Sequence, residues 1–257
     1  MGKAVRNISW TFLSTIIVSL IQIGQLGILA HHVSVSDMGI LSVIFTIINI
    51  AAIFQDVGFS SFLIYKQDIR EIQRHCLFTL NITMGISLFL LALSASHFFE
   101  TWFEFENFAS LFSLASLNFI FMAIGSQAQA LLIKEKKLTL LAQLEILTKL
   151  LSFLVMISLL GLGYGIAAQI IALLAGTLLF SCSLLWMIKD TYSMRFSFAW
   201  EELREPLVYG GYHLGSVFIG EVRKQIDVLI AAKFLGGETL GLYTVCLLYT
   251  SPSPRDS

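Results

Sequence analysis

Apolar and polar positions along this chain alternate in long blocks. Six apolar stretches are separated by short polar segments, and a seventh begins near Leu207. The six are Ile8–Ala30, Met38–Ile64, Cys76–Phe98, Phe108–Ile133, Leu138–Leu160 and Ile166–Ile188. A helix needs roughly 20 apolar residues to cross the hydrocarbon core of a membrane. A single segment of that length satisfies its own backbone hydrogen bonds there only as a helix. The pattern therefore predicts an all-α polytopic membrane protein.

Lysine and arginine are confined to alternate segments between these stretches. The N-terminal segment and the second, fourth and sixth gaps hold eleven of them, and the other three gaps hold none. They are Lys3, Arg6, Lys66, Arg70, Arg74, Lys134, Lys136, Lys137, Lys189, Arg195 and Arg204. Cytoplasmic loops carry the excess of basic residues. We therefore expect a cytoplasmic N-terminus, a cytoplasmic Lys189–Glu205 connection, and an outward third gap that contains Glu100, Glu104 and Glu106.

Composition agrees with a membrane protein and narrows the chemistry. The chain is 56% hydrophobic and 13% charged, with a mean hydropathy of +0.82. No basic surface for nucleic acid is visible. The three cysteines, Cys76, Cys182 and Cys246, lack the spacing of disulfide or metal sites. We see no nucleotide-binding loop, metal-ligand set or nucleophile–base pair, so we expect no catalytic residue, metal or cofactor.

An internal repeat divides the chain. A shift of 202 residues (28 to 230) places Ile28–Val33 over Ile230–Leu235 and Asp37–Leu41 over Thr239–Tyr243. This shift spans six helices and restores the same orientation in the membrane, as in transporters built from parallel repeats. The stretch 247–257 resembles translated adapter sequence, so we expect a non-native tail on a fragment. The expected parts are a six-helix N-terminal lobe 1–188, a cytoplasmic connection 189–206, the first helices of a truncated second lobe 207–246, and the tail 247–257.

Short motifs occur in a fixed order along the chain. They are Gln25–Ala30 with Ser36–Leu41, Gln55–Ser60 with Leu63 and Ile64, Tyr209–Gly211, and Gln225–Ile230 with Lys233–Gly236 and Leu240–Tyr243. From Met1 to about Val245 the chain resembles the polysaccharide-transport branch of the multidrug/oligosaccharidyl-lipid/polysaccharide exporter superfamily. That branch includes O-antigen and teichuronic-acid flippases. The chain departs from the family pattern by stopping early in the second lobe.

The resemblance carries expectations about architecture and substrate. It implies two six-helix lobes around a central cavity that opens alternately to the two sides of the cytoplasmic (inner) membrane of a bacterium. It also implies an oligosaccharide linked to undecaprenyl pyrophosphate as substrate. The expected partners are this lipid-linked oligosaccharide and the lipid bilayer, with glycan polymerases as candidates.

Two charged residues interrupt the fifth apolar stretch. Glu145 and Lys149 are four residues apart, so they lie on one helix face and can pair there. Ala142 and Ser152 extend this face. Ionisable residues inside membrane helices usually face a cavity or a partner. Two interpretations remain open: a cavity wall that touches sugar or pyrophosphate, or a neutralised pair between helices.

Polar residues also mark the first and seventh stretches at positions that the repeat makes equivalent. Gln22 and Gln25 correspond to Lys224 and Asp227. We expect both helices to face a cavity, with Lys224 and Arg223 as candidates to bind the pyrophosphate, because cations suit phosphate oxygens. The alternative places part of this stretch at the membrane interface.

Two further groups of acidic residues have simpler interpretations. Asp56 precedes Val57 and Gly58, where it either caps a helix break or binds a cation. Glu201, Glu202 and Glu205 are interpreted as the solvated start of a helix.

Three functions compete. The motifs favour a flippase for lipid-linked oligosaccharide. A cation-coupled multidrug antiporter of the same superfamily is the first alternative. A polyprenyl-sugar glycosyltransferase or polymerase is the second, but such an enzyme should show a large outward loop or a cytoplasmic carboxylate cluster with catalytic residues.

Topology gives the first prediction. In a cysteine-free background, an impermeant thiol reagent added to cells should label Ser34→Cys and spare Ser193→Cys, because the basic residues place residue 193 in the cytoplasm. Labelling after permeabilisation is the control for reactivity. Labelling of residue 193 in intact cells, with protection of residue 34, would contradict the proposed orientation.

Overall fold

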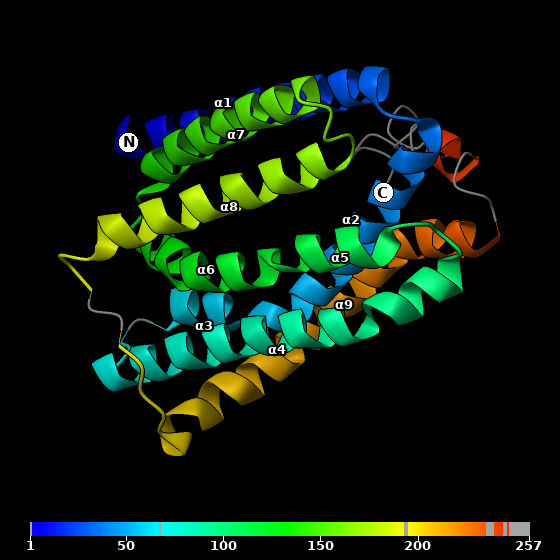
Figure 1. The fold of residues 1–257 in the computed structure, drawn as a ribbon. Helices are drawn as coiled ribbons and strands as arrows, with labels where there is room; N and C mark the ends of the chain where they lie inside the picture. The colour runs from blue at the N-terminus through cyan, green and yellow to red at the C-terminus, as the bar shows by residue number, and fades with distance from the viewer. Residues whose placement is uncertain (1, 67, 193–194, 235–238, 244–245, 247–257) are drawn as a thin grey trace.

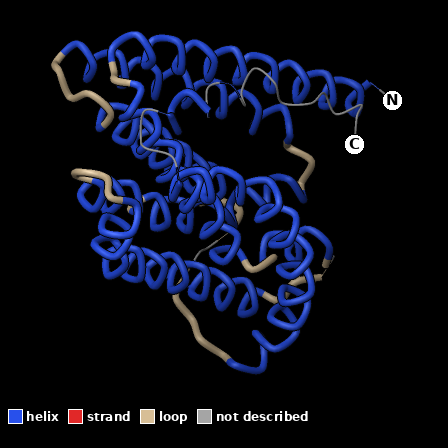
Figure 2. The backbone as a smooth tube through the Cα atoms, turned by 90° about the vertical axis from the view of Figure 1, so that its right-hand side faces the viewer, coloured by secondary structure: helices blue, strands red, loops and turns tan. Residues whose placement is uncertain are grey.

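The computed structural model describes residues 2–66, 68–192, 195–234, 239–243 and 246. It confirms the all-α polytopic architecture, since this part of the chain contains long helices and no strand (Figure 2). The helices are α1 Gly2–His32, α2 Val35–Asp56, α3 Phe59–Tyr65, α4 Glu71–Phe103, α5 Phe108–Ser116, α6 Asn118–Lys134, α7 Leu138–Gly161, α8 Ala167–Ile188 and α9 Trp200–Phe234.

Six segments in the described part are long and apolar enough to cross a membrane. They are Trp10–His32, Val35–Asp56, Glu71–Phe103, Phe108–Lys134, Leu138–Gly161 and Ala167–Ile188. Each contains most of one predicted apolar stretch. The fourth stretch contains two helices, α5 and α6. Leu117 joins them and has a right-handed helical backbone. The apolar pattern thus located all six segments.

The helices form a bundle in which neighbours in space are often distant in sequence. In Figure 1, α1 and α7 lie side by side along one edge, with α8 and then α6 next to them. On the other side of the bundle, α4 packs against α5 and α6, while α9 packs against α2, α3 and α4. Helix α9 is therefore attached to the side of the bundle remote from α1 and α7.

The second apolar stretch breaks into α2 and the short α3. Val57 and Gly58 both have left-handed backbones, with φ of 45° and 76°. Glycine adopts this conformation readily, whereas a β-branched valine does so at a cost. Asp56 offsets part of this cost. Its Oδ1 accepts hydrogen bonds from the Ser60 amide at 3.1 Å and the Ser60 hydroxyl at 2.7 Å. These are the bonds of a helix cap at a break.

Helix α9 begins at Trp200, earlier than the apolar stretch that starts near Leu207. Its first turn is polar and contains Glu201 and Glu202. Carboxylates are favourable near the positive end of a helix dipole. The first turn therefore extends the helix into the segment that composition alone assigned to the connection.

Glycines let α9 and the short segment after it approach the backbone of α2. A Cβ atom added to Gly210 would overlap the carbonyl oxygen of Val57, and one added to Gly241 would overlap the carbonyl oxygen of Val35. Gly210 belongs to the motif Tyr209–Gly211, and Val57 to the motif Gln55–Ser60. Motifs far apart in sequence thus meet through backbone contacts.

This packing gives the second prediction. Gly210→Ala should lower the free energy of unfolding by about 1–3 kcal/mol, because a methyl group has no space against Val57. Gly211→Ala is the matched control, because nothing lies within 4 Å of a Cβ at that position. The apparent melting temperature of the detergent-solubilised chain measures the difference. Equal melting temperatures for the two variants would show that α9 does not pack closely at Gly210.

Candidate functional site

A polar cavity of about 440 Å³ lies inside the bundle, between α1, α2, α6, α7 and α8. Apolar residues such as Leu26, Leu41 and Phe45 form most of the surface of its wall, and we call it the polar cavity for the polar side chains that it also contains. The polar lining residues are Gln22, Gln25, Ser42, Asn49, Asn118, Lys149, Ser152 and Gln169. Eight polar side chains converge on one space from five membrane helices, and this convergence makes the cavity the candidate site.

Lys149 is the charged residue among those that line this cavity. Its side chain is half-buried on α7, and within the described part of the chain no hydrogen bond or ion pair engages it. A charged side chain within a membrane helix costs roughly 2.5–3.5 kcal/mol on insertion scales. Such a cost is reduced when the ammonium group faces a polar cavity. No carboxylate is among the described lining residues, so the cavity favours anions and hydroxyl-rich ligands.

Amide groups supply both donors and acceptors around Lys149. The Asn118 amide nitrogen lies 3.2 Å from the sulfur of Met122, and its Oδ1 is buried without a hydrogen-bond partner. The Oε1 atom of Gln169 is likewise buried without a partner. An unpartnered buried acceptor costs about 1–3 kcal/mol. Both oxygens are enclosed by protein atoms and expose almost no surface to the cavity.

Ser152 fixes the wall of the cavity between α7 and α8. Its Oγ donates to the carbonyl oxygen of Ala172 at 2.7 Å. A Cβ atom on Gly176 would lie 3.0 Å from the Ser152 Cβ, so the two helices are in close contact there. Small residues thus let α7 and α8 pack closely about one turn after Lys149.

Glu145 lies one helical turn before Lys149 and lines a second cavity of about 310 Å³. This cavity shares Asn118, Lys149 and Ser152 with the first. Between the described side chains, Glu145 and Lys149 form no ion pair within 4.0 Å. Their spacing allows a pair, but the structure places both along adjoining cavities. Lys149 therefore lines both cavities, whereas Glu145 lines the second.

Four of the predicted site residues come together here: Gln22, Gln25, Lys149 and, at the adjoining cavity, Glu145. Sequence reasoning missed the contribution of α2. Ser42 and Asn49 are seven residues apart, which is nearly two helical turns, so they share one face. That spacing of isolated polar residues in an apolar stretch was the available signal.

The predicted site residues of α9 lie elsewhere. Arg223 is exposed, and Asp227 accepts hydrogen bonds from the Val228 amide at 2.9 Å and the Tyr243 hydroxyl at 3.4 Å. Lys224 is on the helix, but its side chain lies outside the described part of the structure. The nearby Gln225 accepts a hydrogen bond from Thr46 of α2 at 3.2 Å. The described side chains of α9 do not line the polar cavity.

The described residues contain no cluster of side chains that could hold a metal ion. No group of three or more histidine, cysteine, aspartate or glutamate side chains comes together there.

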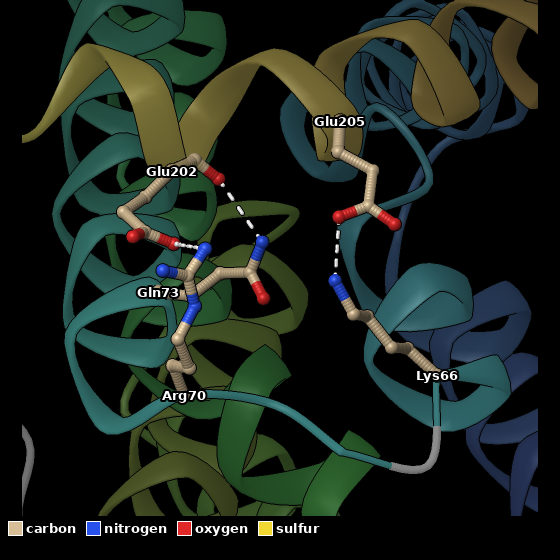
Figure 3. Close-up of polar contacts among 5 residues, drawn as sticks. All are labelled: Lys66, Arg70, Gln73, Glu202 and Glu205. Carbon is tan, nitrogen blue, oxygen red and sulfur yellow. Dashed lines mark hydrogen bonds and ion pairs between the residues drawn. The ribbon is translucent and has the colours of Figure 1, made fainter.

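Charged and polar contacts hold the start of α9 to α4 and to Lys66 and Arg70, which lie between α3 and α4 (Figure 3). Glu205 pairs with Lys66, and a Glu202 carboxylate oxygen lies 2.8 Å from Arg70 Nη2. Glu202 is 8% exposed. The interpretation of these glutamates as a solvated helix start is therefore wrong for Glu202. It fails because the basic residues that cover Glu202 are distant in sequence.

Pro206 lies inside α9 and changes the hydrogen bonding of its first turn. A proline has no N–H group, so the carbonyl oxygen four residues earlier, on Glu202, loses its helical donor. Gln73 of α4 replaces that donor: its Nε2 lies 3.1 Å from the Glu202 carbonyl oxygen, and the glutamine is buried. Figure 3 shows this bond beside the Arg70–Glu202 pair. The bond explains why a buried glutamine is present at this position.

Comparisons with known proteins identify relatives. A family model described as "Polysaccharide biosynthesis protein" matches residues 28–252. The chain is 31% identical over 187 residues to the amylovoran biosynthesis protein AmsL of Erwinia amylovora, covering 72% of this chain and 48% of AmsL. It is 28% identical over 240 residues to the teichuronic acid biosynthesis protein TuaB of Bacillus subtilis, covering 92% and 49%.

A more distant relative is the lipopolysaccharide biosynthesis protein WzxC of Escherichia coli. The identity is 22% over 254 residues, which cover 95% of this chain and 49% of WzxC. The chain thus spans about half the length of the curated relatives it matches. No solved structure matches it.

The contact between Gln73 and Glu202 gives the third prediction. Gln73→Leu should lower the free energy of unfolding by about 1–2 kcal/mol, because the Glu202 carbonyl oxygen loses its donor. In a Pro206→Ala background, the restored N–H group should remove most of this loss. A double-mutant cycle of apparent melting temperatures measures the coupling. Additive effects would contradict it, and Gln143→Leu on exposed α7 surface is the control.

Proposed function

The chain belongs to the polysaccharide biosynthesis protein family, and we propose that it forms the first lobe and the start of the second lobe of a flippase. The flippase carries an oligosaccharide linked to a polyprenyl pyrophosphate across the cytoplasmic membrane of a bacterium. The N-terminus and the connection before α9 lie in the cytoplasm in this proposal. Three relatives named for the biosynthesis of amylovoran, teichuronic acid and lipopolysaccharide support this role.

One observation of the structure carries the proposal. The polar cavity contains one lysine, several amide and hydroxyl groups, and no carboxylate among its described lining residues. Sugars present many hydroxyl groups, and the amide and hydroxyl side chains that line the cavity can form hydrogen bonds with them. The Lys149 ammonium group suits an anionic group of the substrate, such as the pyrophosphate or an acidic sugar. This combination suits a glycan more closely than it suits an apolar, cationic drug.

The cations of α9 form a second part of the proposed substrate path. Arg223 and Lys224 occupy neighbouring positions on this helix, and successive positions of an α-helix are about 100° apart around its axis. In the proposal, Lys224 faces the space between the two lobes and attracts the pyrophosphate, while Arg223 acts from the edge. Gln22 and Gln25 face the same substrate from α1.

Export of glycan by the full-length transporter in a flippase-deficient strain gives the fourth prediction. Lys149→Met should lower export at least about tenfold without changing membrane abundance, because a charged hydrogen bond contributes about 1.5–3 kcal/mol. Lys149→Arg should retain part of the activity. Lys224→Ala should abolish export, with partial activity in Lys224→Arg.

Lys189→Met is the matched control, because Lys189 lies over the ring of Trp186 at the end of α8, away from the cavity. Normal export by Lys149→Met at normal abundance would show that the cavity does not bind the substrate. Normal export by both Lys224→Ala and Arg223→Ala would show that the cations of α9 do not contribute to the substrate path. Export of a cationic drug instead of glycan would favour the antiporter function.

A further inference from the structure

Lys66 and Arg70 form a basic pair at the cytoplasmic end of the bundle, apart from the polar cavity. Lys66 follows α3, and Arg70 immediately precedes α4. The Lys134 ammonium group donates to the carbonyl oxygen of Lys66 at 2.6 Å and holds the backbone of this segment against α6. The two basic side chains are therefore presented from an anchored segment.

Both partners of this basic pair come from α9. The Arg70 side chain is 72% exposed and the Glu205 side chain 61% exposed, so solutes from the cytoplasm can reach each of the two ion pairs (Figure 3). The other partner of each pair is more buried, with the Glu202 side chain 10% exposed and the Lys66 side chain 27% exposed. Water and salt therefore screen each pair from one side only. An anion with more charge than a carboxylate can therefore compete for the two cations.

The pair between Arg70 and Glu202 leaves room for a better acceptor. Its nitrogen and oxygen lie 2.8 Å apart, yet the Glu202 Oε2 atom is buried without an aligned hydrogen bond. Guanidinium groups bind phosphate oxygens through two parallel hydrogen bonds, which this contact does not provide. The carboxylate thus balances the charge of Arg70 without satisfying its geometry.

From these contacts we infer that Lys66 and Arg70 form a cytoplasmic binding site for a phosphate anion, which Glu202 and Glu205 occupy as internal anions in this structure. The inference rests on the proposed function, because the carrier of the flippase substrate supplies a pyrophosphate at this face of the membrane. Binding of that pyrophosphate displaces the two glutamates and releases the start of α9 from α4. Arrival of the substrate is then coupled to movement of the helix that begins the second lobe.

Two hydrogen bonds from backbone amides to side chains of α4 should break when the start of α9 is released. The Arg195 amide donates to Nδ1 of His75 at 3.3 Å, and the Ser197 amide donates to Oγ1 of Thr79 at 2.9 Å. Both join the segment before α9 to α4. Amide hydrogen exchange in residues 195–206 therefore measures the attachment without a transport assay.

The experiment uses the whole chain in lipid nanodiscs of zwitterionic lipid, with inorganic pyrophosphate as the probe. Pyrophosphate should raise exchange in residues 195–206 about two- to fivefold, the range expected for loss of a partly exposed ion pair. Sodium chloride at equal ionic strength should not reproduce the increase, and exchange in α7 should stay constant. Arg70→Gln and Lys66→Gln should each abolish the response to pyrophosphate.

Variants of the internal anions supply the matched controls. Glu202→Gln and Glu205→Gln should raise basal exchange in this segment, whereas Glu201→Gln should not, because Glu201 is exposed and forms no ion pair within the described part of the chain. An unchanged exchange rate with pyrophosphate in the unmodified chain would overturn the inference. An equal increase with chloride would overturn it as well.

Two further comparisons complete the test. One identifies the source of the phosphate, and the other distinguishes failure of this inference from failure of the proposed function. Nanodiscs that contain anionic phospholipid test the membrane itself; a full response without pyrophosphate would overturn the carrier as the source. Loss of the exchange response while export still depends on Lys149 would overturn this inference alone. A response to pyrophosphate without export of glycan would overturn only the proposed function.

Discussion

A peptide group that is shielded from water needs a hydrogen-bonding partner inside the protein, and this constraint accounts for two irregularities in the bundle. Straight helices meet it without help from neighbours. Where α2 ends at Val57 and Gly58, the side chain of Asp56 bonds to Ser60. Where Pro206 removes a donor from α9, Gln73 replaces it from another helix. At both of these interruptions, one polar side chain bonds to the backbone.

The constraint also explains which features could be predicted from the sequence. The apolar stretches predicted all six spans because length and composition decide whether a segment crosses a membrane. Glu145 and Lys149, four residues apart as the sequence shows, lie on the face of α7 that lines the cavities. These are local properties that a single helix carries by itself.

Other features depend on contacts between distant segments and left weaker signals. Glu202 is buried because Arg70, far away in sequence, covers it, so a local interpretation assigned it to solvent. Asn49 and Ser42 join the site only because α2 lies opposite α7 across the cavity. The motifs around Gly210 and Val57 are short because the contact between them involves backbone and needs no particular large side chain.

The described residues that line the polar cavity belong to α1, α2, α6, α7 and α8, and none of them comes from α9. Its shape therefore depends on distances inside one compact unit. A ligand held there keeps the same contacts however the remainder of a two-lobed molecule is arranged around that unit. In the proposed flippase, the contacts of this cavity would then not set the direction of transport, which would depend on the surfaces between the two lobes.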